Sequence, residues 1–323
     1  MKLKIKTAAL LLSAIAILTA CNNKNEDNSE LPAIETQATE TQAIQAKTAT
    51  IKHTLADDYS LTAENFPLID GSTSTIPLVG GLKAMLFGVP QLEAENTVSH
   101  TKTHTAFQNL LDGKCDVIFT VPLSKEQEQE ARERGIEIEM LPVAVEGFVF
   151  VVNKENPVTA LSQEQLRGIY SGEITNWGEL GGNDAPIIAY QRNLDSGSQN
   201  HMLEFMGVVP LSDPILELVR TGMDSLMDSI AVYDNAVDSI GYSVYSYAGQ
   251  MYSEVMNVKF IEVDGVPISL DTLADKSYPL LSVTYMMYRK DTPADSPVLR
   301  LAEFVQSEEG TAAIRGAGYV PYN

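Results

Sequence analysis

The chain has 323 residues, of which 20% are charged, and a formal net charge of −21. Such an excess of acidic residues argues against binding to nucleic acid or to an anionic membrane surface, because both repel negative charge. A small anion is still allowed, since a single arginine and helix N-termini act locally while distant surface charges are screened by salt.

The N-terminus has the pattern of a secretory signal over residues 1–20. Lys2, Lys4 and Lys6 precede an apolar run from residue 8 to 18 that is too short to span a bilayer. The run leads into the sequence LTAC, which resembles a bacterial lipobox, where Cys21 would be lipidated after cleavage. An ordinary signal with a chance cysteine is the alternative. We therefore predict a protein held by its lipid on the extracytoplasmic face of the cell membrane.

Residues 21–58 are predicted to form a flexible tether. Asn, Glu, Thr, Gln and Ala dominate this segment, and large apolar residues are almost absent. Such a composition cannot bury enough apolar surface to offset the entropy of ordering the chain. About 265 residues then remain, enough for one large domain or two smaller lobes.

Predicted strands alternate with predicted helices after the tether. The apolar run from Gly147 to Val152 predicts a strand that is buried on both faces and therefore parallel to its neighbours. The segment from Ser162 to Gln165 has the form of a capping box and opens a helix. This alternation indicates a layered α/β fold.

Three turns rich in hydroxyl groups each precede a helical pattern. They comprise residues 71–77, residues 99–105 and the sequence Ser196-Gly197-Ser198. The first N–H groups of a helix have no internal partner and are partly positive, and Arg192 lies just before the third turn. Together these features favour a site for a tetrahedral oxyanion. The alternative is that Ser196 only caps its helix while Arg192 pairs with Asp195.

Two further groups were weighed as chemical sites. His100 and His104 are spaced four apart, as metal ligands on a helix can be, but no third ligand is evident and no metal is predicted. Apart from Cys21, the only cysteine is Cys115. An internal disulfide is therefore not expected. The apolar neighbours of Cys115 favour a buried structural thiol.

The sequence also resembles a known family over nearly all of the chain after the tether. The motifs follow in order as Asn156-Pro157-Val158, Ile169-Tyr170-Ser171-Gly172, Ile174-Thr175-Asn176-Trp177, Leu180-Gly181-Gly182, and Arg192 with Ser196-Gly197-Ser198. They look like those of the phosphate-binding proteins of bacterial ABC importers. The resemblance implies a type II periplasmic-binding-protein-like fold with two lobes, each a mostly parallel sheet flanked by helices, and an anion in the cleft between them.

The resemblance assigns the predicted phosphate-binding residues position by position: Ser74, Thr75, Ile76, Thr103, Thr120, Arg192, Ser196, Gly197 and Ser198. Thr120 stands where the better-known members have an aspartate that accepts the phosphate proton. Another tetrahedral oxyanion is therefore the alternative ligand. Our hypothesis for phosphate selectivity is that Asp70 or Glu146 faces the cleft and accepts that proton instead.

The two lobes are expected to be discontinuous, with residues 59–145 and 245–323 in one lobe and 146–244 in the other. The function implied is capture of inorganic phosphate for an ABC importer, with the permease subunits as partners, a monomeric state, and no cofactor or nucleic acid. A lipoprotein that senses phosphate or adheres at the surface is an alternative. A secreted phosphatase or serine hydrolase is disfavoured, because no histidine or carboxylate pair has the spacing of a nucleophile and base.

Overall fold

The computed structural model describes residues 53–194, 196–213, 219–220, 227, 230, 236–251 and 257–322. The predicted signal peptide, the lipidation site Cys21 and most of the predicted tether lie outside these residues. The sequence also has helical patterns through Leu216 and Val219 and from Met223 to Val237, and most of these residues lie outside the described ones. The chain from His53 to Asn323 forms one compact unit. Within the described part, no helix is both long and apolar enough to cross a membrane.

The first described helix lies within the last residues of the predicted tether. Residues Leu55–Asp58 form the short helix α1, which opens with a capping box at Thr54. Ala56 is buried at 1% exposure, and Leu55 packs on the core. The apolar side chains of Leu55 and Ala56 thus give this short helix a surface to bury against the core.

The centre of the unit is an eight-stranded sheet in which β1, β2, β11, β3, β8 and β5 follow in spatial order, with β12 and β9 also paired to β3. The strands are β1 (Ile69–Gly71), β2 (Val117–Thr120), β3 (Ile138–Asn153), β5 (Ile188–Ala189), β8 (Ser239–Val244), β9 (Val258–Phe260), β11 (Leu281–Arg289) and β12 (Val320–Pro321). Two small sheets pair β4 (Ala160–Leu161) with β10 (Glu262–Val263), and β6 (Gln191–Arg192) with β7 (Val219–Arg220).

The α/β class is confirmed, but the predicted strand direction is wrong in detail. In the main sheet β1 and β2 are parallel, as are β5 and β8, whereas β3 is antiparallel to β8, β9, β11 and β12. The residues from Val149 to Val152 are fully buried, as the apolar run predicted. Burial on both faces results from the helices above and below the sheet, and an antiparallel strand can occupy such a layer equally well. The sheet is therefore mixed rather than mostly parallel.

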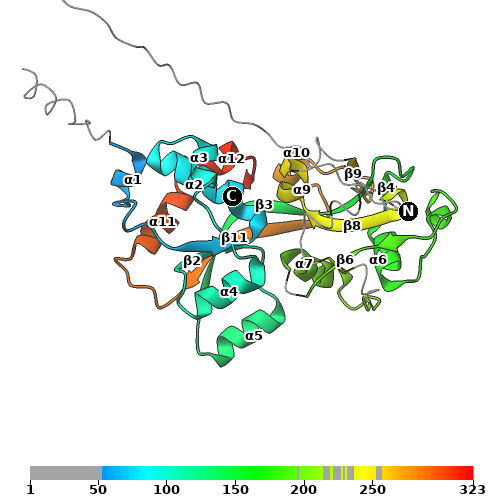
Figure 1. The fold of residues 1–323 in the computed structure, drawn as a ribbon, viewed down its shortest axis with the longest axis horizontal. Helices are drawn as coiled ribbons and strands as arrows, with labels where there is room; N and C mark the ends of the chain where they lie inside the picture. Colours follow the sequence, from blue (N-terminus) through cyan, green and yellow to red (C-terminus); the bar gives the residue numbers. More distant parts are fainter. Residues whose placement is uncertain are drawn as a thin grey trace, which may run out of the picture. The chain divides into compact units, whose positions relative to one another are not determined.

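Helices cover both faces of this sheet. In Figure 1, α2, α3, α9, α10 and α12 lie on one side of β3 and β11, while α4, α5, α6 and α7 lie on the other. The α-helices are α2 (Ile76–Phe87), α3 (Gln91–Glu95), α4 (Thr103–Leu111), α5 (Lys125–Glu133), α6 (Gln163–Ser171), α7 (Gly197–Met206), α9 (Tyr245–Met251), α10 (Leu270–Ala274), α11 (Pro297–Gln306) and α12 (Glu308–Gly316). Short 3₁₀ segments are η2 (Thr73–Thr75), η3 (Trp177–Leu180) and η5 (Ala236–Asp238).

Serine caps start several of these helices. Ser162 accepts a hydrogen bond from the N–H of Gln165 at the start of α6, which confirms the predicted capping box. Ser124, Ser196 and Ser307 cap α5, α7 and α12 in a similar way. Each cap satisfies one of the helix N–H groups that lack an internal partner.

The apolar core divides along the strand β3. One cluster surrounds its second half and includes Phe150, Tyr170, Trp177 and Tyr242. Two other clusters lie around β2, β11 and the first half of β3, under α2, α11 and α12 in one case and under α4 in the other. The division into lobes at residues 146 and 245 stays a prediction.

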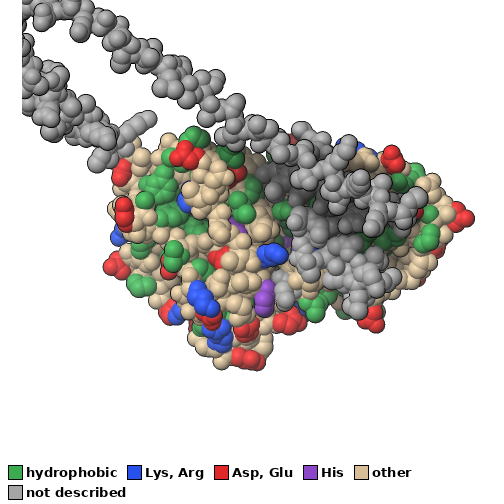
Figure 2. Space-filling model, in the orientation of Figure 1, with side chains coloured by type: hydrophobic (Ala, Val, Ile, Leu, Met, Phe, Trp, Pro, Cys, Tyr) green, Lys and Arg blue, Asp and Glu red, His purple; other side chains and the backbone are tan. Residues whose placement is uncertain are grey.

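Acidic side chains are numerous on the face of the molecule that Figure 2 shows. Figure 2 shows acidic side chains spread over the visible face of the described residues, with basic side chains between them. Cys115 is buried, its thiol points to the carbonyl oxygen of Ala106, and burial raises its pKa to about 12. The prediction that this thiol is buried is confirmed.

Candidate functional site

The first hydroxyl-rich turn links β1 to α2 through η2. The Thr75 side-chain oxygen lies 2.8 Å from the Ser72 carbonyl oxygen and 3.1 Å from that of Phe119. The N–H groups of Thr75 and Ile76 donate to the carbonyl oxygens of Ser72 and Thr73. These groups of Thr75 and Ile76 are thus used to build the turn.

Ser74 provides the side chain of this turn that is least committed to the backbone. Its hydroxyl lies 2.9 Å from the Ser72 hydroxyl, and either group can be the donor. Its carbonyl oxygen accepts a hydrogen bond of 2.6 Å from Tyr319. Ser74 is buried at 7% exposure, and its contacts with Ser72 and Tyr319 hold it in place.

His100 supports the same turn, which the sequence did not predict. Its Nδ1 atom lies 2.8 Å from the Ser72 carbonyl oxygen and 3.2 Å from the Thr75 hydroxyl. Burial lowers the pKa of His100, with the Ser72 carbonyl and the Asp70 charge acting against that shift. The contacts of Nδ1 give the His100 ring a structural role in this turn. Among the described residues, no three His, Cys, Asp or Glu side chains are grouped to hold a metal ion.

The second and third turns meet at the N-termini of α4 and α7. Thr103 is the first residue of α4 and Gly197 the first of α7. A Cβ atom placed on Gly197 would lie 2.9 Å from the Thr103 hydroxyl oxygen and 2.9 Å from a methyl group of Val121. The N-termini of α4 and α7 therefore lie against one another. In the first turn of each helix, N–H groups have no acceptor within the helix itself.

The third turn has the geometry that its sequence predicted. Ser196 caps α7 by accepting a hydrogen bond of 3.1 Å from the N–H of Gln199. Gly197 and Ser198 follow in the first helical turn and are both buried. Because Gly197 and Ser198 begin the helix, no carbonyl group earlier in the helix can accept a hydrogen bond from their N–H groups. These two N–H groups are therefore suited to bind an anion.

Arg192 is the buried cation of this region, at 7% exposure. It ends the short strand β6, and its backbone N–H donates to the Tyr242 hydroxyl at 2.9 Å and to the Gln199 side chain at 3.3 Å. Tyr242 also bonds to Gln199. Burial raises the pKa of Tyr242, and the hydrogen bond from the Arg192 N–H and the Arg192 charge oppose that shift. The alternative pairing of Arg192 with Asp195 involves a residue outside the described part.

Thr120 is fully buried at the end of β2. Its hydroxyl oxygen has no hydrogen-bond partner among the described residues, although it is shielded from solvent. A buried hydroxyl without a partner is costly, and a bound ligand or water molecule can complete its hydrogen bonding.

Both carboxylates proposed as proton acceptors are already bonded by the protein. The oxygens of Asp70 accept from the N–H groups of Gly71 and Thr101, the Thr101 hydroxyl and the Asn109 amide, at 2.6 to 2.8 Å. Four donors fill the acceptor sites of one carboxylate. Our hypothesis is therefore wrong for Asp70, which fixes the segment that leads into α4.

Glu146 is buried where β3 passes between the two groups of core residues. It accepts from the N–H groups of Gly147 and Ser246, at 2.9 and 3.1 Å, and from the Ser246 hydroxyl. Burial raises its pKa despite these bonds. Through its bonds to Ser246, Glu146 fixes the start of α9. This helix packs on η2.

Replacing Asp70 with asparagine should destabilise the fold, by about 2 to 3 kcal/mol, because an amide would face donors that now bond to a charged acceptor. Burial alone would raise the pKa of Asp70, but the hydrogen bonds from Thr101, Asn109 and Gly71 lower it below its usual value. The stabilisation should thus be present above about pH 4, the pKa of an unfolded aspartate, and be lost as pH falls through the folded pKa. Urea unfolding of both proteins between pH 7 and 3 tests this, and a constant difference would contradict it.

The arrangement defines a class of protein before any comparison. An α/β fold that gathers hydroxyl groups, helix N-termini and one buried arginine from separated parts of the chain is suited to bind a small oxyanion. The chain belongs to the PBP superfamily, whose domain model matches residues 67–309. The resemblance noted in the sequence is thereby confirmed.

Individual relatives are similar in sequence and structure. A phosphate-binding protein PstS of Staphylococcus aureus is 25% identical over 258 residues, which cover 78% of this chain and 76% of the relative. A substrate-binding protein of Clostridium perfringens, assigned to a phosphate ABC transporter and solved with bound phosphate, is 25% identical with a TM-score of 0.63; the match covers 79% of this chain and 98% of that one. An ABC-type phosphate transport receptor of Vibrio cholerae is also 25% identical, with a TM-score of 0.58 and coverage of 78% and 98%.

These relatives decide between the classes of function that the sequence left open. All three are named for binding or transporting phosphate, and none for catalysis. The prediction of a solute-binding protein rather than an enzyme is confirmed. Sequence reasoning missed the supporting residues His100, Tyr242, Gln199 and Tyr319, because their roles depend on contacts between distant parts of the chain.

Proposed function

We propose that this protein captures inorganic phosphate for an ABC importer. The observation that supports this most is the unpartnered buried hydroxyl of Thr120, in the same region as two abutting helix N-termini and the buried Arg192. The names of the relatives support phosphate as the ligand.

Each proposed residue has a distinct part in binding. Arg192 supplies the full positive charge and a planar pair of donors that match two phosphate oxygens. The hydroxyl groups of Ser74, Thr103, Thr120 and Ser198 and the N–H groups of Gly197 and Ser198 donate to the remaining lone pairs. Ser196 holds α7 in place through its cap, and Thr75 and Ile76 hold the first turn.

Phosphate should bind one to one, with a Kd near micromolar or tighter, because a charge-assisted arginine contact and several buried donors act together. Isothermal titration calorimetry on protein freed of copurifying anion measures this. No heat at millimolar phosphate would contradict the proposal.

Sulfate in the same experiment tests the alternative oxyanion. Phosphate near neutral pH keeps a proton that sulfate lacks, and the Thr120 hydroxyl can either donate or accept. Asp70 and Glu146 already accept hydrogen bonds from the protein, so neither is an open acceptor for the phosphate proton. If sulfate competes as well as phosphate, the protein is a general binder of tetrahedral oxyanions.

Delivery to a permease would use the two predicted lobes, which would close on the ligand as a hinged pair. A single chain contributes every proposed ligand group, so a monomer is sufficient. A gene for a phosphate permease beside this one would favour transport over surface sensing or adhesion.

We further propose that lipid on Cys21 anchors the protein to the extracytoplasmic face of the membrane. Replacing Cys21 with alanine should release the protein into the soluble fraction, because the predicted tether has no other membrane-binding feature. Fractionation of cells that express each form, followed by immunoblotting, measures the shift. Retention of the variant in membranes washed with high salt would show that another feature anchors the chain.

A further inference from the structure

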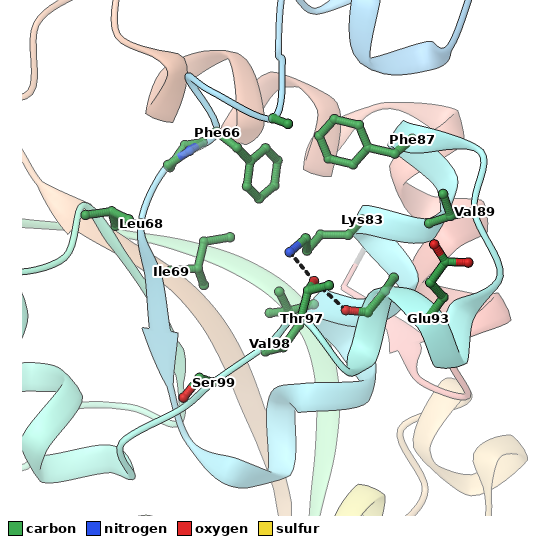
Figure 3. Close-up of a pocket in the computed structure, with 14 residues that line it drawn as sticks. Phe66, Leu68, Ile69, Lys83, Phe87, Val89, Glu93, Thr97, Val98 and Ser99 are labelled. Carbon is green, nitrogen blue, oxygen red and sulfur yellow. Dashed lines mark hydrogen bonds between the residues drawn. The ribbon is translucent and has the colours of Figure 1, made fainter. Parts of the chain in front are cut away.

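A pocket lies apart from the residues proposed to bind phosphate. It has a volume of about 460 Å³ and is bounded by the segment that enters β1, by α2, and by α3 with the residues after it. This volume falls within the range of roughly 300 to 1,000 Å³ that is usual for small-molecule sites. Figure 3 shows its wall, which is mainly apolar and includes Phe66, Leu68, Ile69, Phe87, Val89 and Val98.

One lysine extends into this apolar surrounding. Lys83 comes from α2, its ammonium group donates to the Thr97 hydroxyl, and it lies 5.6 Å from the centre of the Phe66 ring (Figure 3). Glu93 also lines the pocket, but within the described part of the chain no carboxylate forms an ion pair with Lys83. The pocket therefore contains the positive charge of Lys83, whose hydrogen-bond partner in the pocket is the neutral hydroxyl of Thr97.

This placement has an electrostatic cost. Burial lowers the pKa of Lys83, because the apolar wall removes part of the water that would solvate the ammonium group. A carboxylate next to the ammonium would restore the favourable environment of the charged form. In a chain with a net charge of −21, a half-buried lysine without a carboxylate partner is notable.

We propose that this pocket binds a medium-chain aliphatic carboxylate, with its carboxylate on Lys83 and its hydrocarbon chain against the apolar wall. Size and chemistry both limit the ligand. A phosphate or another dianion would need more donors than one ammonium and one hydroxyl provide, whereas a monocarboxylate needs few. The hydrocarbon chain of the ligand gains binding free energy by burial against the side chains around Phe66 and Phe87. The rings of these two residues pack edge to face, with their centres 5.4 Å apart.

The test compares octanoate with 1-octanol, which share a chain and differ in charge. Each is titrated into the full chain by isothermal calorimetry, in the presence of saturating phosphate so that the anion site is occupied. Octanoate should bind at least roughly tenfold more tightly than octanol, since a charge-assisted hydrogen bond is about twice as strong as a neutral one. No octanoate binding, or equal binding of both compounds, would overturn the proposal.

Two substitutions separate the charge from the space. Lys83→Met keeps a straight apolar side chain and should weaken octanoate binding at least roughly tenfold while leaving octanol unchanged. Lys114→Met, at an exposed lysine paired with Asp112, is the matched control and should change neither. Val89→Trp fills the pocket and should remove binding of both compounds. Octanoate affinity unchanged by both Lys83→Met and Val89→Trp would place its binding elsewhere.

Discussion

Replacing Arg192 with alanine is expected to abolish phosphate binding while the protein stays folded. Arg192 is buried at 7% exposure beside the start of α7, where water cannot easily replace a lost guanidinium. Truncating one partner of a buried, hydrogen-bonded charge pair costs about 2 to 5 kcal/mol, which is from roughly thirty-fold to several thousand-fold in Kd. Calorimetry with phosphate measures the loss directly.

The fold should survive because the backbone N–H of Arg192 keeps its hydrogen bonds in the alanine variant. Its N–H, which the substitution keeps, donates to Tyr242 and Gln199. Arg192→Lys should recover only part of the affinity, since an ammonium cannot form the planar pair of bonds. Arg134→Ala is the control, because Arg134 pairs with Asp112 and Glu130 on the surface. Wild-type affinity in Arg192→Ala would place this arginine outside the binding site.

The sequence predicted those parts of the site that are local in the chain. Ser196 as the cap of α7 and the helix after Thr75 both follow from periodicity and capping rules that act over a few residues. The position of Arg192 next to the third turn is equally local. These elements could be predicted because their hydrogen bonds close within one turn or one strand.

The remaining features depend on contacts that no short pattern records. The direction of β3 was predicted wrongly, because burial on both faces is set by the helices that cover a sheet and not by its strand directions. The roles of Asp70 and Glu146 could not be derived either. Their donors, Asn109 and Ser246, are 39 and 100 residues away in the chain. Whether a buried carboxylate faces a ligand or a protein donor is decided by such long-range packing.

The contact between the second and third turns leads to the other large expected effect. Gly197→Ala should weaken phosphate binding by about tenfold or more, which corresponds to about 1.4 kcal/mol. A Cβ atom there would lie 2.9 Å from both the Thr103 hydroxyl oxygen and a methyl group of Val121, closer than side chains normally approach. The clash could be relieved only by moving Thr103, itself a proposed donor, or by separating the N-termini of α4 and α7.

The measurement should separate binding from stability. If α4 and α7 belong to different lobes, the lobes can part to relieve the clash, so the unfolding temperature should change little while the phosphate Kd rises. Gly316→Ala is the matched control, because Gly316 ends α12 with open space around its Cβ position and no positive φ. That variant should keep wild-type affinity. Unchanged affinity in Gly197→Ala would show that the two helix N-termini need not approach this closely when phosphate is bound.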